Sequence, residues 1–269
     1  SLDEERAFNV HPLFDKRPAL GQGTSVEFSM PLRGELKMAA ERLIAFGPEI
    51  WIAEGPVVTS MGFPYPTRMA IVRLGDGGLF LWSPIRLTPG LQATVDVLGT
   101  VRYLVSPSKR HHLFLAEWKA AYPWARMYAA PGLIQQRRDL AFDDKLADRA
   151  PQAWAADLDQ VLVHGSFAMT EAVFFHRASA TALICDLVQH LPPAKGLKGW
   201  LSKRRGVVAQ ATTPLDYRAT FTHRKAIRQA VKHILGWNAE RVIIAHGDVV
   251  EENAAAFLQQ ALGWVHAEK

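Results

Sequence analysis

Histidine and aspartate side chains follow several apolar segments of this sequence, at the point where each segment ends. Three segments have the length and composition of buried strands: Val101–Val105 leads to His111 and His112, Thr181–Cys185 leads to Asp186, and Arg241–Ala245 leads to His246. Ligands collect at the carboxyl ends of strands in α/β folds, because loops and helix N-termini converge there. Imidazole and carboxylate groups are donors that zinc or iron accepts. The pattern therefore predicts a metal site built from His111, His112, Asp186 and His246.

Each of these residues has a simpler structural interpretation when it is taken alone. The histidine pair could begin a helix, Asp186 could cap the turn after its strand, and His246 could be a turn residue before Gly247. The same pattern at three separate strand ends favours one shared site over three unrelated turns.

The order of the predicted elements places these strand ends in a layered α/β fold. Arg68–Leu74 and Leu79–Ser83 form a predicted hairpin, because the turn at residues 75–78 (Gly-Asp-Gly-Gly) accepts positive φ angles. Strands and helices then alternate, with helices predicted at Leu87–Leu98 and Leu113–Ala121. Hairpins followed by strand–helix alternation indicate sheets sandwiched between helices.

Composition suggests how the chain is divided. Residues 1–42 mix charge, Pro and Gly without a periodic apolar face, and we expect a loosely ordered extension there. Residues 43–269 are expected to form one domain with a basic insertion at about residues 192–216. The insertion contains a cluster of cationic residues: Lys195, Lys198, Lys203, Arg204 and Arg205. Such a run is usually a solvated loop, and Trp200 alone makes a weak stacking platform for nucleic acid.

The whole-chain composition excludes several classes of protein. The 269 residues carry a net charge of +5 and are 49% hydrophobic, enough to bury a sizeable core. No apolar run approaches the roughly 20 residues that a membrane helix needs. The single cysteine, Cys185, rules out an internal disulfide and fits a reducing compartment, so we expect a cytoplasmic protein. The expected partner is a small-molecule substrate, with no clear nucleic-acid or membrane partner, and the oligomeric state stays open.

Several short motifs together resemble a known superfamily. They are Gly55-Pro56-Val57-Val58, Phe63-Pro64-Tyr65-Pro66-Thr67-Arg68-Met69, His111-His112-Leu113-Phe114-Leu115-Ala116-Glu117-Trp118, Met169-Thr170-Glu171 and Ala245-His246-Gly247. In this combination and order the chain resembles the metallo-β-lactamase superfamily, close to an uncharacterised branch known only as a domain of unknown function. The resemblance covers roughly residues 43–265. It implies a four-layer αββα sandwich of the metallo-β-lactamase type.

The resemblance also implies which metal ligands are missing. The superfamily's signature loop is His-x-His-x-Asp-His, and aligning its last position on His112 places His111 on the Asp, Lys109 on the second His and Pro107 on the first. The later His of the first metal site falls near Ala168 or Met169, which cannot ligate a hard or borderline ion. The resemblance thus implies one divalent ion, zinc or else iron, in an altered second site.

Such a site is typical of several functions. Our leading hypothesis is a mononuclear metal-dependent hydrolase of an ester, thioester, amide or phosphoester, with Asp186 and Lys109 as the catalytic residues. The Lys109 ammonium would hold an anionic group or a developing oxyanion, although a solvated loop lysine is the commoner case. Glu171 and Asp248 are expected to orient the histidine ligands. The alternatives are a degenerate member that binds a metal or ligand without turnover, since four protein ligands close a zinc site, and an iron-dependent oxidoreductase.

Overall fold

The computed structural model describes residues 43–60, 63–191 and 204–266. The predicted extension at residues 1–42 lies outside the described residues, as do residues 192–203 of the predicted insertion. The described residues all belong to the unit that begins at Ala40. In these ranges no helix combines the length and apolarity needed to cross a bilayer.

One sheet contains seven strands that follow one another in chain order. The strands are β1 (Ile44–Gly47), β2 (Ile50–Ser60), β3 (Phe63–Arg73), β4 (Gly78–Trp82), β5 (Thr100–Ser106), β6 (Arg126–Ala129) and β7 (Asp144–Lys145). Pairing is antiparallel from β1 to β4 and parallel from β4 to β7. The change occurs where α1 (Pro89–Leu98) first supplies a crossover, as parallel neighbours require.

The second sheet contains four strands in the order β11-β10-β9-β8. These are β8 (Leu158–Val163), β9 (Glu171–His176), β10 (Thr181–Ile184) and β11 (Arg241–Ile244). The first three form antiparallel pairs, while β10 and β11 run parallel. Their carboxyl ends therefore lie at the same edge, which brings residues 185–186 and 245–247 together.

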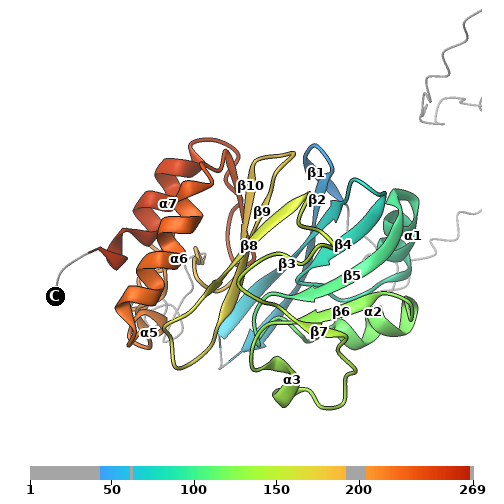
Figure 1. Cartoon of the computed structure of the whole chain (residues 1–269), viewed down its shortest axis with the longest axis horizontal. Helices are drawn as coiled ribbons and strands as arrows, with labels where there is room; N and C mark the ends of the chain where they lie inside the picture. The colour runs from blue at the N-terminus through green and yellow to red at the C-terminus, as the bar shows by residue number, and fades with distance from the viewer. Residues whose placement is uncertain (1–42, 61–62, 192–203, 267–269) are drawn as a thin grey trace, which may run out of the picture. The chain divides into compact units, whose positions relative to one another are not determined.

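The two sheets pack face to face and helices cover both outer faces (Figure 1). Helices α1 and α2 (Leu115–Ala121) pack on the outer face of the seven-stranded sheet, with the short α3 (Leu133–Gln136) nearby. Helices α6 (Arg224–Gly236) and α7 (Ala254–Leu262) cover the four-stranded sheet. The short α5 (Leu215–Arg218) precedes α6, and the 3-10 turn η2 (Gly263–Val265) follows α7. This is the predicted αββα sandwich.

The first helix shows why the sequence folds as expected. Thr88 caps it by accepting a hydrogen bond from the Leu91 backbone at 3.2 Å, and Pro89 occupies its first turn. Leu91 and Val95 face the sheet and are fully buried. Cap, proline and apolar spacing thus all favour the same helix.

The main difference from the sequence prediction is the length of the β2–β3 hairpin. Each strand has eleven residues, whereas the hairpin predicted from the sequence pattern includes only Arg68–Leu74 from this part of the chain. Prolines at positions 56, 64 and 66 disfavour strand in a pattern analysis, since proline cannot donate to the ladder. The register shift between Gly55 and Val58 accommodates the first of them. The longer hairpin matters because residues 65–68 reach the candidate site.

Candidate metal site

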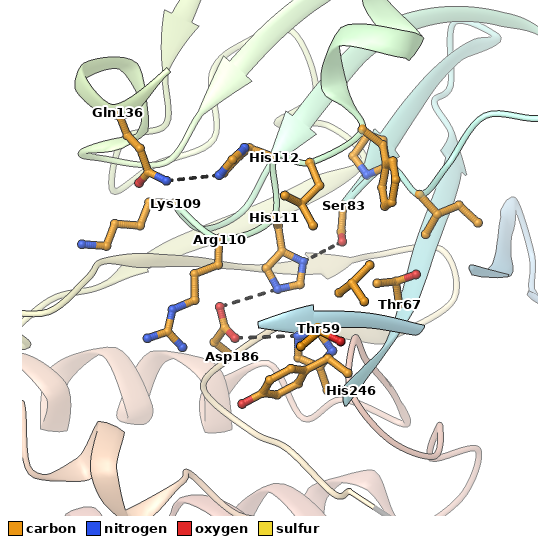
Figure 2. A pocket seen from close by; sticks show the side chains of 16 residues that line it. Thr59, Thr67, Ser83, Lys109, Arg110, His111, His112, Gln136, Asp186 and His246 are labelled. Carbon is orange, nitrogen blue, oxygen red and sulfur yellow. Dashed lines mark hydrogen bonds and ion pairs between the residues drawn. The ribbon is translucent and has the colours of Figure 1, made fainter. Parts of the chain in front are cut away.

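Three chain segments from different parts of the sequence meet at one place (Figure 2). His111 lies on the turn between β5 and α2, Asp186 follows β10, and His246 follows β11. The Nε2 atom of His111 lies 3.5 Å from Oδ2 of Asp186, and the Nε2 atom of His246 lies 3.7 Å from Oδ1. The two imidazole rings have centroids 5.1 Å apart. The structure therefore brings together three of the four predicted ligands.

The hydrogen bonds of His246 fix which of its nitrogens is free. Its Nδ1 atom lies 2.8 Å from the carbonyl oxygen of Pro66, and because a carbonyl can only accept, Nδ1 carries the proton. Burial, followed by the neighbouring charge of His111, lowers the pKa of His246 to about 4. The ring is therefore neutral near pH 7, with its Nε2 lone pair directed toward Asp186. A neutral imidazole in this orientation is a metal ligand.

His111 is oriented from the opposite side. Its Nδ1 atom lies 2.7 Å from the hydroxyl oxygen of Ser83, which follows β4 in a left-handed backbone conformation (φ 54°). A hydroxyl can accept from Nδ1 in the tautomer that leaves Nε2 free. Ser106 holds the turn by donating to the His111 carbonyl at 2.7 Å. Neither Ser83 nor Ser106 is recognisable from the sequence pattern as a residue that positions His111.

Asp186 is the buried carboxylate at the centre of the group, with 2% exposure. It accepts a hydrogen bond from the Ser108 hydroxyl at 2.9 Å. Burial alone would raise the pKa of Asp186, but its contact with His111 and the charges of His111 and His246 outweigh burial and lower it. Asp186 is therefore ionised and supplies an anionic donor.

Glu171 lies beneath this aspartate and not against a histidine, contrary to our expectation. Its carboxyl oxygens accept hydrogen bonds from the backbone of Cys185, Asp186 and Leu187 at 2.8, 2.9 and 2.7 Å. Burial, followed by the charge of Asp186, raises the pKa of Glu171. Glu171 thus fixes the backbone that carries Asp186.

His112 is not part of the group. Its Nε2 atom is 3.1 Å from Gln136 and its Nδ1 atom is 2.8 Å from an Arg137 nitrogen, which donates to the ring. Figure 2 shows the ring directed toward Gln136 and away from Asp186. Neighbouring residues of the turn point in different directions, so His111 and His112 do not reach the same centre. Burial, followed by the charge of Arg137, lowers the pKa of His112.

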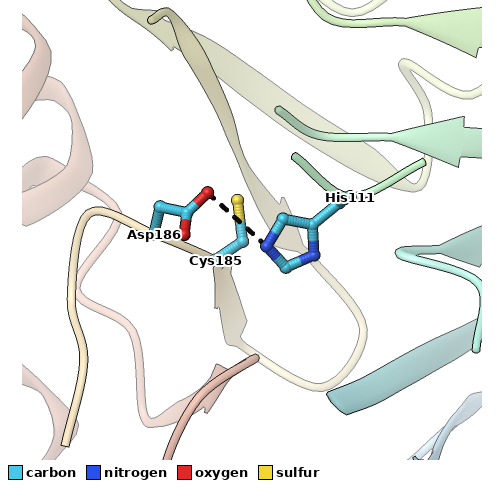
Figure 3. Close-up of side chains that lie close together, drawn as sticks. All are labelled: His111, Cys185 and Asp186. Atoms are coloured by element: carbon cyan, nitrogen blue, oxygen red, sulfur yellow. Dashed lines mark ion pairs between the residues drawn. The ribbon is translucent and has the colours of Figure 1, made fainter. Parts of the chain in front are cut away.

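Cys185 is a further candidate donor that the sequence analysis missed as a ligand. Ligand atoms of His111, Cys185 and Asp186 all lie within 4.8 Å of one another (Figure 3). In a regular strand, Cys185 and Asp186 would point to opposite faces. The strand β10 ends at Ile184, so that alternation no longer applies. A cysteine directly before the aspartate at a strand end was the available signal.

The distances between donors test whether a metal ion fits. Two donors in a tetrahedral site, each roughly 2.0–2.1 Å from zinc, are roughly 3.3–3.4 Å apart. The separations of 3.5 and 3.7 Å are close to that spacing and too long for good N–H···O hydrogen bonds. The two distances end on different oxygens of Asp186, and the donor atoms that all lie within 4.8 Å of one another are those of His111, Cys185 and Asp186. Imidazole, thiolate and carboxylate donors suit a divalent ion, so the residues present fit one at His111 and Asp186, with His246 beside them.

Unpartnered polar atoms belong to residues near the group. Among the described residues, three buried side-chain atoms have no hydrogen-bond partner: Trp82 Nε1, Gln189 Oε1 and Tyr217 Oη. The Trp82 ring lies 6.4 Å from the His111 ring, and Gln189 donates to Asp186 at 3.4 Å. Burial, followed by the charges of Glu171 and Asp186, raises the pKa of Tyr217. Buried polar atoms are rarely left unpaired, so ordered water belongs near these three atoms. The indole N–H of Trp82 can only donate, so it needs an acceptor and not a cation.

A pocket of about 310 Å³ opens beside the three donors. Its lining combines polar and apolar residues: Val58, Thr59, Tyr65, Thr67, Ser83, Pro84, Ile85, Lys109, Arg110, His111, His112, Leu113, Phe114, Gln136, Asp186 and His246. Lys109, the second predicted catalytic residue, lies on this lining. The donors are thus accessible to a small molecule.

Comparison with solved structures shows which fold this is. A metallo-β-lactamase from Pontibacter korlensis matches with a TM-score of 0.58 at 15% identity, covering 84% of this chain and 99% of that one. A metallo-β-lactamase from Pseudomonas aeruginosa in its mono-zinc form has a TM-score of 0.56 at 11% identity, covering 83% and 95%. A metal-soaked flavodiiron core from Synechocystis sp. PCC6803 has a TM-score of 0.55 at 8% identity, covering 83% and 60%. The predicted metallo-β-lactamase-like fold is confirmed.

The family is also defined. The model of the family described as "Domain of unknown function (DUF4336)" matches residues 49–196, which is more than half of the chain. The chain therefore belongs to this family, as the motifs predicted. A search among curated proteins found no match.

Proposed function

We propose that the chain is a mononuclear metal-dependent hydrolase whose single ion is held by His111, Asp186 and His246. The observation that carries this proposal is the placement of two imidazole Nε2 atoms on either side of one buried carboxylate, at 3.5 and 3.7 Å. The substrate is an ester, thioester, amide or phosphoester small enough for the adjoining pocket.

The orientation of His112 supports a catalytic and not a structural role. Four protein ligands close a tetrahedral zinc site, whereas three leave a position for water or substrate. Because His112 is engaged with Gln136 and Arg137, three of the four predicted ligands remain, and all three border the pocket. When bound, a divalent ion would supply Lewis acidity and a water-derived nucleophile near neutral pH.

Side chains of this protein would perform the remaining tasks. Ser108 and Gln189 orient the Asp186 carboxylate, and the Pro66 carbonyl holds the His246 ring in its ligating tautomer. Lys109, on the pocket lining, would hold an anionic group of the substrate or stabilise a developing oxyanion. A cytoplasmic location belongs to the same proposal, since the chain's one cysteine is buried and free.

An iron-dependent oxidoreductase is the second candidate. Two histidines and one carboxylate with open positions are typical donors of non-haem iron sites. The third candidate is a degenerate member of the family that binds a metal without turnover. Cys185 as a fourth protein ligand would favour this role, because four ligands leave no open position on the ion.

Reconstitution separates these three functions. The metal-free protein is loaded with zinc, or anaerobically with iron, and assayed against a panel of chromogenic esters, thioesters and phosphoesters. Hydrolysis by the zinc form that disappears in His246→Ala supports the proposal, with His223→Ala, an exposed histidine before α6, as the matched control. Oxygen consumption by the iron form alone would favour the oxidoreductase. Metal binding without either activity would favour the degenerate member.

A further inference from the structure

Two cationic side chains stand on the pocket beside the donors. Lys109 and Arg110 belong to the same turn as His111 and both line the pocket. Figure 2 shows the two side chains extending to the same side of the site. Lys109 is half-buried and Arg110 is exposed. Within the described part of the chain, neither cationic group has an ion-pair or hydrogen-bond partner.

The pocket has no free carboxylate to neutralise them. Asp186 is the one acidic residue on the described lining. It accepts a hydrogen bond from Ser108, is flanked by His111 and His246, and interacts electrostatically with Arg110. Two cationic groups thus share the pocket with one carboxylate that is already hydrogen-bonded, which leaves positive charge for an anion brought by a ligand. Ammonium and guanidinium groups form their strongest hydrogen bonds with carboxylate and phosphate oxygens.

The lining also includes an apolar surface. It is made of Val58, Tyr65, Pro84, Ile85, Leu113 and Phe114. Leu113 is 54% exposed although it is large and apolar, so a ligand that covered it would remove apolar area from water. The volume of about 310 Å³ lies near the lower limit for small-molecule sites.

We infer that the substrate is a small amphipathic anion, in which an apolar body carries a carboxylate or phosphate that Lys109 and Arg110 bind. That this anion is hydrolysed rests on the proposed function, whereas its binding to the pocket does not. The apolar lining holds the body, the cationic pair holds the oxyanion, and together they place the reacting group next to His111, Asp186 and His246.

Calorimetric binding to the metal-free protein tests the inference without turnover. The probes are hexanoate, monohexyl phosphate, the neutral isostere hexanamide, and acetate, which has the charge without the body. We expect one of the two hexyl anions to bind on the order of tenfold or more tightly than hexanamide, and acetate to bind more weakly than either anion. The stronger of the two anions identifies which oxyanion the site selects.

Variants then assign the binding to the cationic pair. Lys109→Met combined with Arg110→Met should abolish the preference for the anion while leaving hexanamide affinity unchanged. Lys232→Met, which removes an exposed cation from α6, is the control for net charge and should keep the preference. Thermal denaturation of each variant confirms that it is folded.

Three results would overturn the inference. They are equal affinity for anion and amide in the wild-type chain, an anion preference that persists in the double variant, and anion binding that appears only after metal loading. None of these results depends on hydrolysis, so the binding test still decides the inference if the chain proves not to be a hydrolase.

Discussion

The carbonyl oxygen of Pro66 lies 2.8 Å from Nδ1 of His246, 180 residues later in the sequence. This contact joins the long β2–β3 hairpin of one sheet to the end of β11 in the other. It also determines that the Nε2 atom of His246 is the one that faces Asp186. The ligating tautomer of the second imidazole is thus set by a strand that carries no metal ligand of its own.

Arg68 reinforces the same connection, and this predicts a variant. Its guanidinium donates to the carbonyls of Ile244 and Gly247, on either side of His246, while pairing with Glu54. Arg68→Met should loosen the backbone around His246 and reduce metal affinity by about 10–100-fold. Arg73→Met removes a similar arginine–glutamate ion pair, the one with Glu49, and should leave metal affinity unchanged. Equal metal affinities of the two variants in a competition titration would refute the role of Arg68.

Asp186 should matter more than any positioning residue. Asp186→Ala removes the anionic donor between the imidazoles, so metal affinity should fall well beyond the roughly 100-fold limit of an outer-shell change. Asp76→Ala, in the turn before β4, is the matched control because its carboxylate pairs with Arg102 and neither residue lines the pocket. A chelator competition assay measures both. Retention of wild-type affinity by Asp186→Ala would show that the aspartate only caps its turn, at a cost of about 1 kcal/mol in stability.

The two neighbouring histidines should behave differently. His111→Ala should abolish tight metal binding, because its Nε2 atom faces Asp186. His112→Ala should keep the metal, because its ring contacts Gln136 and Arg137. Metal content after gel filtration distinguishes them. Loss of metal in both variants would restore the four-ligand site expected from the sequence.

That contrast shows what the sequence could and could not predict. The strand ends, the His-Asp-His combination and the αββα fold followed from apolar periodicity and motif order, because strands in this fold direct their carboxyl ends to one place. The separation of His111 from His112 depends on turn geometry, and the contribution of Cys185 depends on β10 ending at Ile184. Pattern analysis places such boundaries only to within a few residues, which is too coarse to assign side-chain directions.

The buried state of His246 predicts a pH dependence of stability in the metal-free protein. Its pKa of about 4 lies below the ordinary value of 6.5, first because of burial and then because of His111. The unfolded chain therefore takes up a proton first as the pH falls, so stability is full above pH 6.5 and declines toward pH 4, by about 3 kcal/mol in all.

Denaturant unfolding at a series of pH values measures this decline. His246→Asn, which lacks the titrating ring, should lose much of the slope between those pH values, whereas His223→Asn, at an exposed position, should keep it. Identical slopes in wild type and His246→Asn would contradict the buried, neutral imidazole.

The metal content of the wild-type protein tests the central claim most directly. The chain is purified without chelator and with zinc and iron in the growth medium, and elemental analysis is set against protein concentration. One oriented set of donors, together with Pro107, Lys109 and Met169 where the resemblance would place the ligands of a first site, predicts about one ion per chain. Two tightly bound ions per chain, or a correctly folded chain that takes up none, would contradict the account.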